Sequence, residues 1–95
     1  MVRPRKHRHM CYNPQVRYFK PQGIPMSHLE EVNLSHDEME ALWLKHHEGL
    51  EQTQGAERMQ ISQSTFGRIL QSAHQKMAQA LLDGKAIRID DTDHS

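Results

Sequence analysis

This 95-residue sequence has little of the features that define several protein classes. Its single cysteine, Cys11, excludes an intrachain disulfide framework. Aromatic residues make up 5% and apolar residues 36% of the chain, so we expect one small core. No apolar run approaches the roughly 20 residues that span a membrane, and no apolar segment follows the basic N-terminus as in a secretory signal. These absences predict a small soluble protein of the cytoplasm with no membrane association.

Catalytic signatures are missing as well. The sequence has no glycine-rich phosphate loop, no nucleophile with a matched base, and no pair of carboxylates in an apolar setting. The adjacent residues His46 and His47 would point about 100° apart on a helix, which is poor geometry for ligands of one ion. We therefore expect neither enzymatic activity nor a bound cofactor.

The formal net charge is zero, but the two signs are separated along the chain. Between residues 30 and 57, eight acidic side chains face only one basic side chain, Lys45, and three more acidic residues lie in the tail 90–95. Such an asymmetry suggests a basic arm that meets a polyanion, joined to an acidic body. Residues 1–20 carry no acid, and their basic side chains are Arg3, Arg5, Lys6, Arg8, Arg17 and Lys20.

The stretch from Gln52 to Leu70 has the pattern of two helices joined by a tight turn. The first helix is expected over Gln52–Met59, with Gly55 and Ala56 on the face where another helix comes close. Ser62 is a good N-cap for the second helix, because its hydroxyl can accept from a free backbone N–H. The side chains expected to point inward around the turn and along the second helix are Met59, Ile61, Phe66, Ile69 and Leu70.

This pattern is typical of a helix-turn-helix, in which the second helix offers its N-terminal residues to the major groove of DNA. The turn residue usually has a positive φ and is usually glycine, whereas this sequence has Gln60, at a cost of about 1 kcal/mol. The alternative is a plain helical hairpin with no role in nucleic-acid binding. We favour the DNA-binding interpretation, because several spacings coincide.

The candidate DNA-binding residues fall into two groups. Gln63 can pair with adenine and Arg68 with guanine or a phosphate, while Gly67 would let the helix approach the DNA closely. The arm would supply salt-dependent affinity for phosphates. Because the second helix is only mildly basic, we expect a homodimer on double-stranded DNA, with half-sites roughly 34 Å apart. The full set is Gln63, Ser64, Thr65, Gly67, Arg68 and Gln71 in the helix, and Arg3, Arg5, Lys6 and Arg8 in the arm.

His7, His9 and Cys11 are candidate metal ligands. A structural zinc site needs four ligands in a tetrahedron, and no fourth candidate lies nearby in the sequence. Ordinary surface histidines beside one thiol explain the pattern equally simply, so we expect no metal here.

The segment before the helices is expected to be irregular. Tyr12–Pro25 holds three prolines and a glycine, which exclude a continuous helix. Its side chains Tyr18, Phe19 and Ile24 are expected to pack on the helical body. Ser27–Leu34 is interpreted as an acidic segment with a helical turn, whose inward residues are Leu29 and Val32.

A first helix is signalled by Ser35 and Glu38, which match a capping box. We expect it to run to about His47 and to end at Gly49 as a C′ residue. Trp43 would lie near the rim of the packed face. The residues expected to form its apolar side are Met39, Ala41, Leu42 and Leu44.

The last helix has no breaker between Ser62 and Gly84, which makes it about 30 Å long at 1.5 Å per residue. The preceding helices are too short to cover its whole apolar stripe, so a second subunit is expected to cover part. Lys85–Ile89 alternates apolar and polar residues and predicts a strand, paired with Val16–Phe19 or with an equivalent segment of a second copy. The stripe comprises Phe66, Ile69, Leu70, Ala73, Met77, Ala80 and Leu81.

Together these patterns predict a mainly α fold. A three-helix core with a helix-turn-helix and a long C-terminal helix would follow an irregular N-terminal extension, with a short pair of strands. The expected organisation is a basic arm and proline-rich connector over residues 1–26, a helix-turn-helix domain over 27–89, and an acidic tail over 90–95.

The chain resembles a family of small bacterial and archaeal proteins whose helix-turn-helix is similar to the fourth region of sigma factors. The matching segments are RPRKHRHMC, YFKPQGIP, LEEVNLSHDEMEAL, HEGLEQTQGAERMQISQSTFGRIL and ALLDGKAIRI, which together run from Arg3 to Ile89. The resemblance implies a DNA-binding transcriptional regulator. Members of that family often have cysteine where His7 stands and glycine where Gln60 stands.

Two other classes of function stay open. The first is a protein-interaction module of the transcription machinery, because helices of this type also bind proteins and the body is acidic. The second is a metal- or redox-responsive sensor that uses His7, His9 and Cys11. The clustered arginines of the arm favour nucleic acid over a pure protein adaptor.

Overall fold

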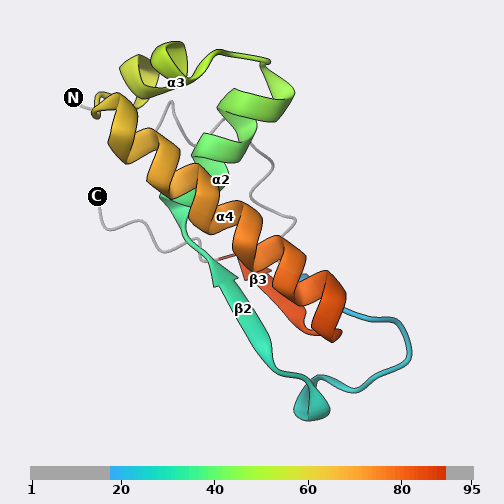
Figure 1. Cartoon of the computed structure of the whole chain (residues 1–95). Helices are drawn as coiled ribbons and strands as arrows, with labels where there is room; N and C mark the ends of the chain where they lie inside the picture. Colours follow the sequence, from blue (N-terminus) through green and yellow to red (C-terminus); the bar gives the residue numbers. More distant parts are fainter. Residues whose placement is uncertain (1–17, 90–95) are drawn as a thin grey trace, which may run out of the picture.

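The computed structural model describes residues 18–89 of the chain. The predictions for the basic arm, for His7, His9 and Cys11, and for the tail 90–95 concern residues outside this range. The described part is mainly helical with a long C-terminal helix, as the sequence predicts, and the predicted pair of strands belongs to a small three-stranded sheet. Figure 1 shows two unequal halves joined by α4 (Gln63–Asp83): three shorter helical segments pack on its start, and the sheet lies along its second half.

The first long helical segment begins with the predicted capping box. Ser35 accepts a hydrogen bond from the backbone N–H of Glu38, and the Glu38 carboxylate accepts from the backbone N–H of Ser35. Helix α2 (His36–Leu42) then passes into a π-helical turn, η3 (Trp43–His47), before the chain reverses after Glu48.

The second helix, α3 (Gln52–Met59), packs across α4. Phe66 is fully buried and its ring lies against the backbone of Gly55, where even a Cβ atom would be 2.8 Å from the ring carbon Cε1. A methyl group does not fit in that space, so Gly55 is required for the close approach. The core of this half consists of Ala41, Leu44, Ala56, Met59, Phe66 and Leu70.

The sheet has the order β1-β3-β2. The predicted C-terminal strand is present as β3 (Ala86–Ile89), and it pairs antiparallel with β1 (Tyr18–Phe19), within the segment of the same chain proposed as its partner. Strand β1 therefore belongs to the sheet although it lies in the stretch assigned to the connector.

The expectation of a helical turn over Ser27–Leu34 was wrong for most of that segment. A 3₁₀ turn covers Met26–His28, and β2 (Glu31–Leu34) is a strand that pairs parallel with β3. Its alternate side chains Val32 and Leu34 are buried, which is the period of a strand with one covered face. Parallel pairing joins residues more than fifty positions apart, which a local pattern does not reveal.

Three apolar side chains expected to be packed are exposed. Leu81 is 80% exposed although it continues the stripe of α4, whereas Ala80, one position earlier in the same turn, is 3% exposed, so the sheet covers only part of the stripe's width there. Phe19 is 51% exposed and Ile24 39% exposed. Most of the predicted stripe is nevertheless covered, with Phe66, Leu70, Ala73 and Ala80 buried.

Candidate nucleic-acid interface

The turn between α3 and α4 is built by Gln60, Ile61 and Ser62. Gln60 has φ 62° and ψ 43°, the left-handed conformation that the sequence predicts for this position. The backbone N–H of Ile61 then donates to the carbonyl of Ala56 at 3.0 Å, which closes the end of α3. Only a short chain therefore separates the two helices, and α4 starts at a fixed angle to α3.

A cluster of hydroxyl groups caps the start of α4. Ser62 accepts from the backbone N–H of Thr65 at 3.1 Å and donates to the Thr65 hydroxyl at 2.7 Å. The hydroxyl of Ser64 lies 3.3 Å from that of Ser62. The cap is the one predicted, and it engages the hydroxyl groups of two candidate DNA-binding residues.

The side chains of four candidate residues lie on the open surface of α4. Gln63, Ser64, Arg68 and Gln71 are exposed, while Thr65 and Gly67 are half-buried. Arg68 forms no ion pair with any of residues 18–89 and so keeps its charge available. The structure thus brings Gln63, Ser64, Arg68 and Gln71 together as one polar face at the start of α4, with Thr65 and Gly67 only partly exposed.

Gly67 does not face open solvent. A Cβ atom at this position would lie 2.6 Å from Nε2 of Gln52, so the side chain of Gln52 fills the space above it. The same Nε2 donates to the carbonyl oxygen of Gln63 at 3.0 Å. Gln52 is a residue of this surface that sequence reasoning missed, and the glycine in the middle of a helix was the available signal.

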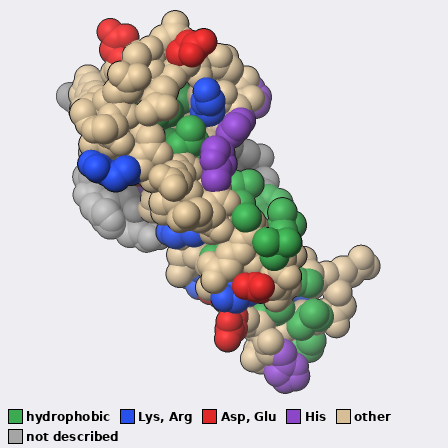
Figure 2. All heavy atoms as spheres, viewed as in Figure 1, with side chains coloured by type: hydrophobic (Ala, Val, Ile, Leu, Met, Phe, Trp, Pro, Cys, Tyr) green, Lys and Arg blue, Asp and Glu red, His purple; other side chains and the backbone are tan. Residues whose placement is uncertain are grey.

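The charges around this face are mixed. Arg58 on α3 lies 3.8 Å from Glu48, and Glu51 and Glu57 on α3 are exposed. Figure 2 shows acidic and basic side chains interspersed on the helical half of the molecule. The described part of the face is therefore polar rather than strongly basic, so most of the positive charge for phosphate binding would come from the arm.

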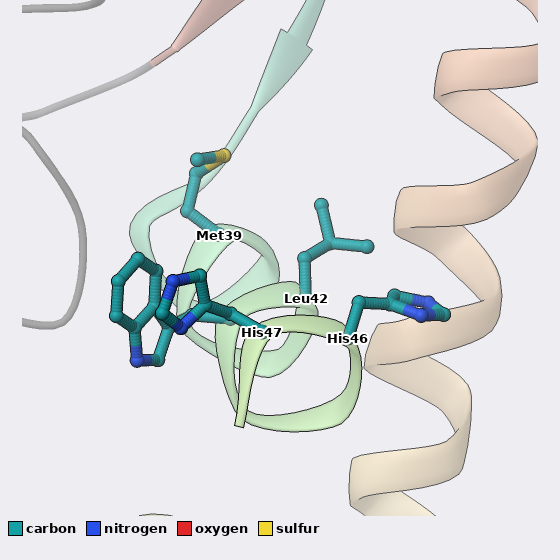
Figure 3. Close-up of a pocket in the computed structure, with 5 residues that line it drawn as sticks. Met39, Leu42, His46 and His47 are labelled. Carbon is teal, nitrogen blue, oxygen red and sulfur yellow. The ribbon is translucent and has the colours of Figure 1, made fainter. Parts of the chain in front are cut away.

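The two adjacent histidines point in different directions, as the helical geometry predicts. In Figure 3 His46 extends toward α4, whereas His47 turns to the other side of η3. His47 stacks on Trp43 with ring centroids 3.7 Å apart. With Met39 and Leu42, these three residues line an open hollow of about 360 Å³.

His46 meets His74 of α4, with their Nε2 atoms 2.8 Å apart. The ring centroids are 5.0 Å apart, so the rings point at each other nearly head-on. That is the geometry of an N–H···N hydrogen bond, because two ligands of one metal ion would converge at an angle on a point between them. Among the residues that the structure describes, no group of three or more histidine, cysteine or acidic side chains is placed to hold a metal ion.

The helices that the structure describes include none with the length and apolar character needed to cross a bilayer.

Comparison with known proteins places this chain in a family. The family described as "Protein of unknown function DUF134" matches residues 1–95, and the chain belongs to it. Similar proteins carry the name UPF0251. One from Halothermothrix orenii is 49% identical over 94 residues, which are 99% of this chain and 70% of that protein.

Two further relatives differ in how much of their length is matched. A UPF0251 protein of Desulforudis audaxviator is 57% identical over 90 residues, which cover 95% of this chain and 59% of the relative. One from Caldanaerobacter subterraneus is 54% identical over 90 residues, which cover 95% of this chain and 76% of that protein. The chain therefore spans between about three fifths and three quarters of these proteins. No solved structure matches this chain.

Proposed function

We propose that this protein binds double-stranded DNA through the face at the start of α4, as a helix-turn-helix regulator of transcription. One observation carries the proposal. The first two turns of α4 are packed on one side by the buried Phe66 and Leu70, and they present Gln63, Arg68 and Gln71 to solvent on the other.

The chemistry of these side chains suits the edges of base pairs. An amide such as that of Gln63 can form two hydrogen bonds with adenine, and a guanidinium such as that of Arg68 can form two with guanine. A helix held at a fixed angle by a short turn can enter the major groove with such side chains leading. The rigid cap at Ser62 and the contact from Gln52 support this role, because both fix the first turn.

The arm supplies the second part of the proposal. Arg3, Arg5, Lys6 and Arg8 would neutralise phosphates, so affinity should fall steeply as salt rises. The acidic residues near α3 repel DNA phosphates, so the arm is required for the affinity to DNA.

The test is selection of bound duplexes from a random pool, followed by fluorescence anisotropy with the selected sequence at several salt concentrations. Arg68→Ala should weaken binding to the selected duplex by about 1–3 kcal/mol and relax the base preference at one position. Replacing the four basic residues of the arm with alanine should weaken binding to all duplexes and reduce the dependence on salt.

Arg58→Ala is the matched control, since it removes one arginine whose guanidinium lies beside Glu48. It should weaken binding far less than Arg68→Ala does, because the Arg58 guanidinium already lies beside a carboxylate. Binding that ignores salt, or that survives both the loss of Arg68 and the loss of the arm, would exclude this function.

The hollow beside Trp43 supports a second candidate, a protein-interaction module. An exposed apolar depression with an indole at its edge is a common site for protein contacts. Trp43→Ala would then abolish binding of a protein partner while leaving the affinity for DNA intact.

A further inference from the structure

The end of α4 carries an apolar surface that the described residues leave open. We name Phe19, Pro21, Leu81, Leu82 and Ile87 the terminal patch. All of these except Leu82 line a groove of about 340 Å³ between β1, β3 and the last turns of α4. Leu82, the next residue of α4 after Leu81, does not line the groove and is 85% exposed. The loop after β1 adds the exposed side chains of Ile24 and Met26.

The terminal patch exposes more apolar area than isolated surface leucines would. Its exposed side chains, with those of the adjoining loop, present on the order of 500 Å² of apolar surface, which is the size of patch that usually serves binding. Hydrophobic side chains gather on the right-hand flank of the sheet half in Figure 2, whereas charged side chains lie toward its left-hand flank.

We propose that the terminal patch binds a second copy of this chain in a two-fold symmetric dimer. In such a contact the same surface meets itself, so a cluster of like charges at its rim would be repulsive. The rim is close to neutral, because its cations already have partners. Lys85, which lines the groove, lies 3.4 Å from Glu30.

The remaining basic group of the rim is occupied as well. Nζ of Lys20 donates to the carbonyl oxygens of Ile24 at 2.8 Å and Pro21 at 3.3 Å, which holds the loop against the patch. An anionic lipid surface or an acidic peptide would need unpaired cations around the groove, so this rim favours self-association.

Two exposed leucines at the end of α4 also suit self-association. In the proposed dimer, Leu81 and Leu82 of one copy would be buried against the groove of the other. Burying roughly 500 Å² on each copy removes about 1,000 Å² from water, which is the lower limit for a specific interface. The dimer should therefore be weak and should dissociate in the micromolar range.

The position of the patch suits a dimer that binds DNA, and this point alone rests on the proposed function. Leu82 and Arg68 are 14 residues apart on one helix, or about 21 Å at 1.5 Å per residue. Two α4 helices that meet at their C-terminal ends can thus place their Arg68 residues up to about 42 Å apart, which spans the roughly 34 Å between half-sites on DNA.

Sedimentation equilibrium of the full 95-residue chain without DNA tests the inference. The protein should pass from monomer to dimer between about 1 μM and about 1 mM. Leu82→Glu should weaken the dimer more than about tenfold, because a carboxylate would have to enter an apolar groove. Gln75→Glu is the matched control, since it adds the same charge to an exposed position of α4 two turns away and should leave the dimer unchanged.

Leu81→Gln is a second variant, and thermal unfolding of both leucine variants should show an intact fold because both side chains are exposed. A wild-type chain that stays monomeric throughout this range would overturn the inference. A dimer that neither leucine variant weakens would overturn it too. If the dimer forms as described and no duplex is ever selected, the protein has this interface but does not bind DNA. If duplexes bind to a chain that never dimerises, the protein binds DNA but the terminal patch is not a dimer interface.

Discussion

The side-chain amide of Gln52 donates a hydrogen bond to the backbone carbonyl of Gln63 across the turn, with Nε2 and O 3.0 Å apart. Gln52 is the first residue of α3 and Gln63 the first of α4. The bond therefore links the starts of the two helices, and it is possible because Gly67 has no side chain in the way. This contact fixes the direction in which the exposed face of α4 points.

Gly67→Ala should weaken DNA binding while leaving the free energy of unfolding nearly unchanged. Alanine is favoured over glycine inside a helix by about 0.8–1 kcal/mol, while loss of the bond from Gln52 costs about 0.5–1.5 kcal/mol. The free energy of unfolding should thus change by less than about 1 kcal/mol, because only the mobile end of Gln52 must move. The affinity for the selected duplex should fall several-fold, as measured by anisotropy. Gln52→Ala should reproduce the loss of affinity, and an unchanged affinity in both variants would remove Gln52 from the interface.

Gly55→Ala should destabilise the protein, unlike Gly67→Ala. A Cβ atom there would overlap the ring carbon Cζ of Phe66 and lie 2.8 Å from Cε1, and the ring is fully buried with no room to shift. Overpacking of this kind costs about 1–3 kcal/mol despite the better helix propensity of alanine. Thermal unfolding of the two glycine variants side by side provides the comparison. Equal melting temperatures for Gly55→Ala and Gly67→Ala would contradict the packing described for Phe66.

Gln60→Gly should stabilise the protein. Gln60 has φ 62°, a left-handed conformation that costs a residue with a Cβ atom about 1 kcal/mol. Removing the Cβ atom should raise the melting temperature by about 4–8 °C for each kcal/mol gained in a domain of this size. Gln79→Gly is the control, because it makes the same replacement at an exposed position within α4 and should lower stability by about 1 kcal/mol. A lower melting temperature for Gln60→Gly would contradict the assigned turn.

Features set by neighbouring residues could be predicted from the sequence. The capping box of Ser35 and Glu38, the left-handed Gln60 and the uninterrupted helix that ends at Gly84 all depend on residues a few positions apart. The strand Glu31–Leu34 was missed because it is stabilised by Ala86–Ile89, a partner far along the chain. Short segments of this kind have no stable structure alone, so their own pattern decides little.

In the candidate site too, features set by neighbouring residues could be predicted, whereas contacts between helices could not. Exposure of Gln63, Arg68 and Gln71 follows from the period of the helix, and the structure has these side chains in the open. The contact of Gln52 with Gln63 depends on how α3 crosses α4, which spacing within either helix does not specify. Leu81 was expected inside because a helical period identifies a stripe, but only the tertiary packing decides how wide a part of that stripe is covered: Ala80 is buried and Leu81 is exposed.

A buried carboxylate ties the two halves of the molecule together. Glu38 accepts hydrogen bonds from the hydroxyl of Ser72 at 2.6 Å, from the backbone N–H of Ser35 at 2.8 Å and from Nζ of Lys76 at 2.9 Å. Lys76 also donates to the carbonyl of Asn33 at 2.7 Å. The group therefore connects the start of α2 and strand β2 to the middle of α4.

The stability of the protein should fall in acid partly because of Glu38. Burial tends to raise the pKa of this carboxyl, but the hydrogen bonds from Ser72, Ser35 and Lys76 outweigh it and hold the pKa below the usual 4.5. A carboxyl whose pKa is lower in the folded state binds fewer protons there than in the unfolded state. Its contribution is thus complete above about pH 4.5 and is lost as the pH falls through the folded-state value. Glu38→Gln should lower the free energy of unfolding at pH 7 by about 1–3 kcal/mol, since the bonds to a charged acceptor become weaker. The difference between wild type and variant, measured by urea unfolding from pH 7 down to pH 3, should shrink as the acid range is entered. A difference that stays constant over this range would show that Glu38 is not held as the anion in the folded protein.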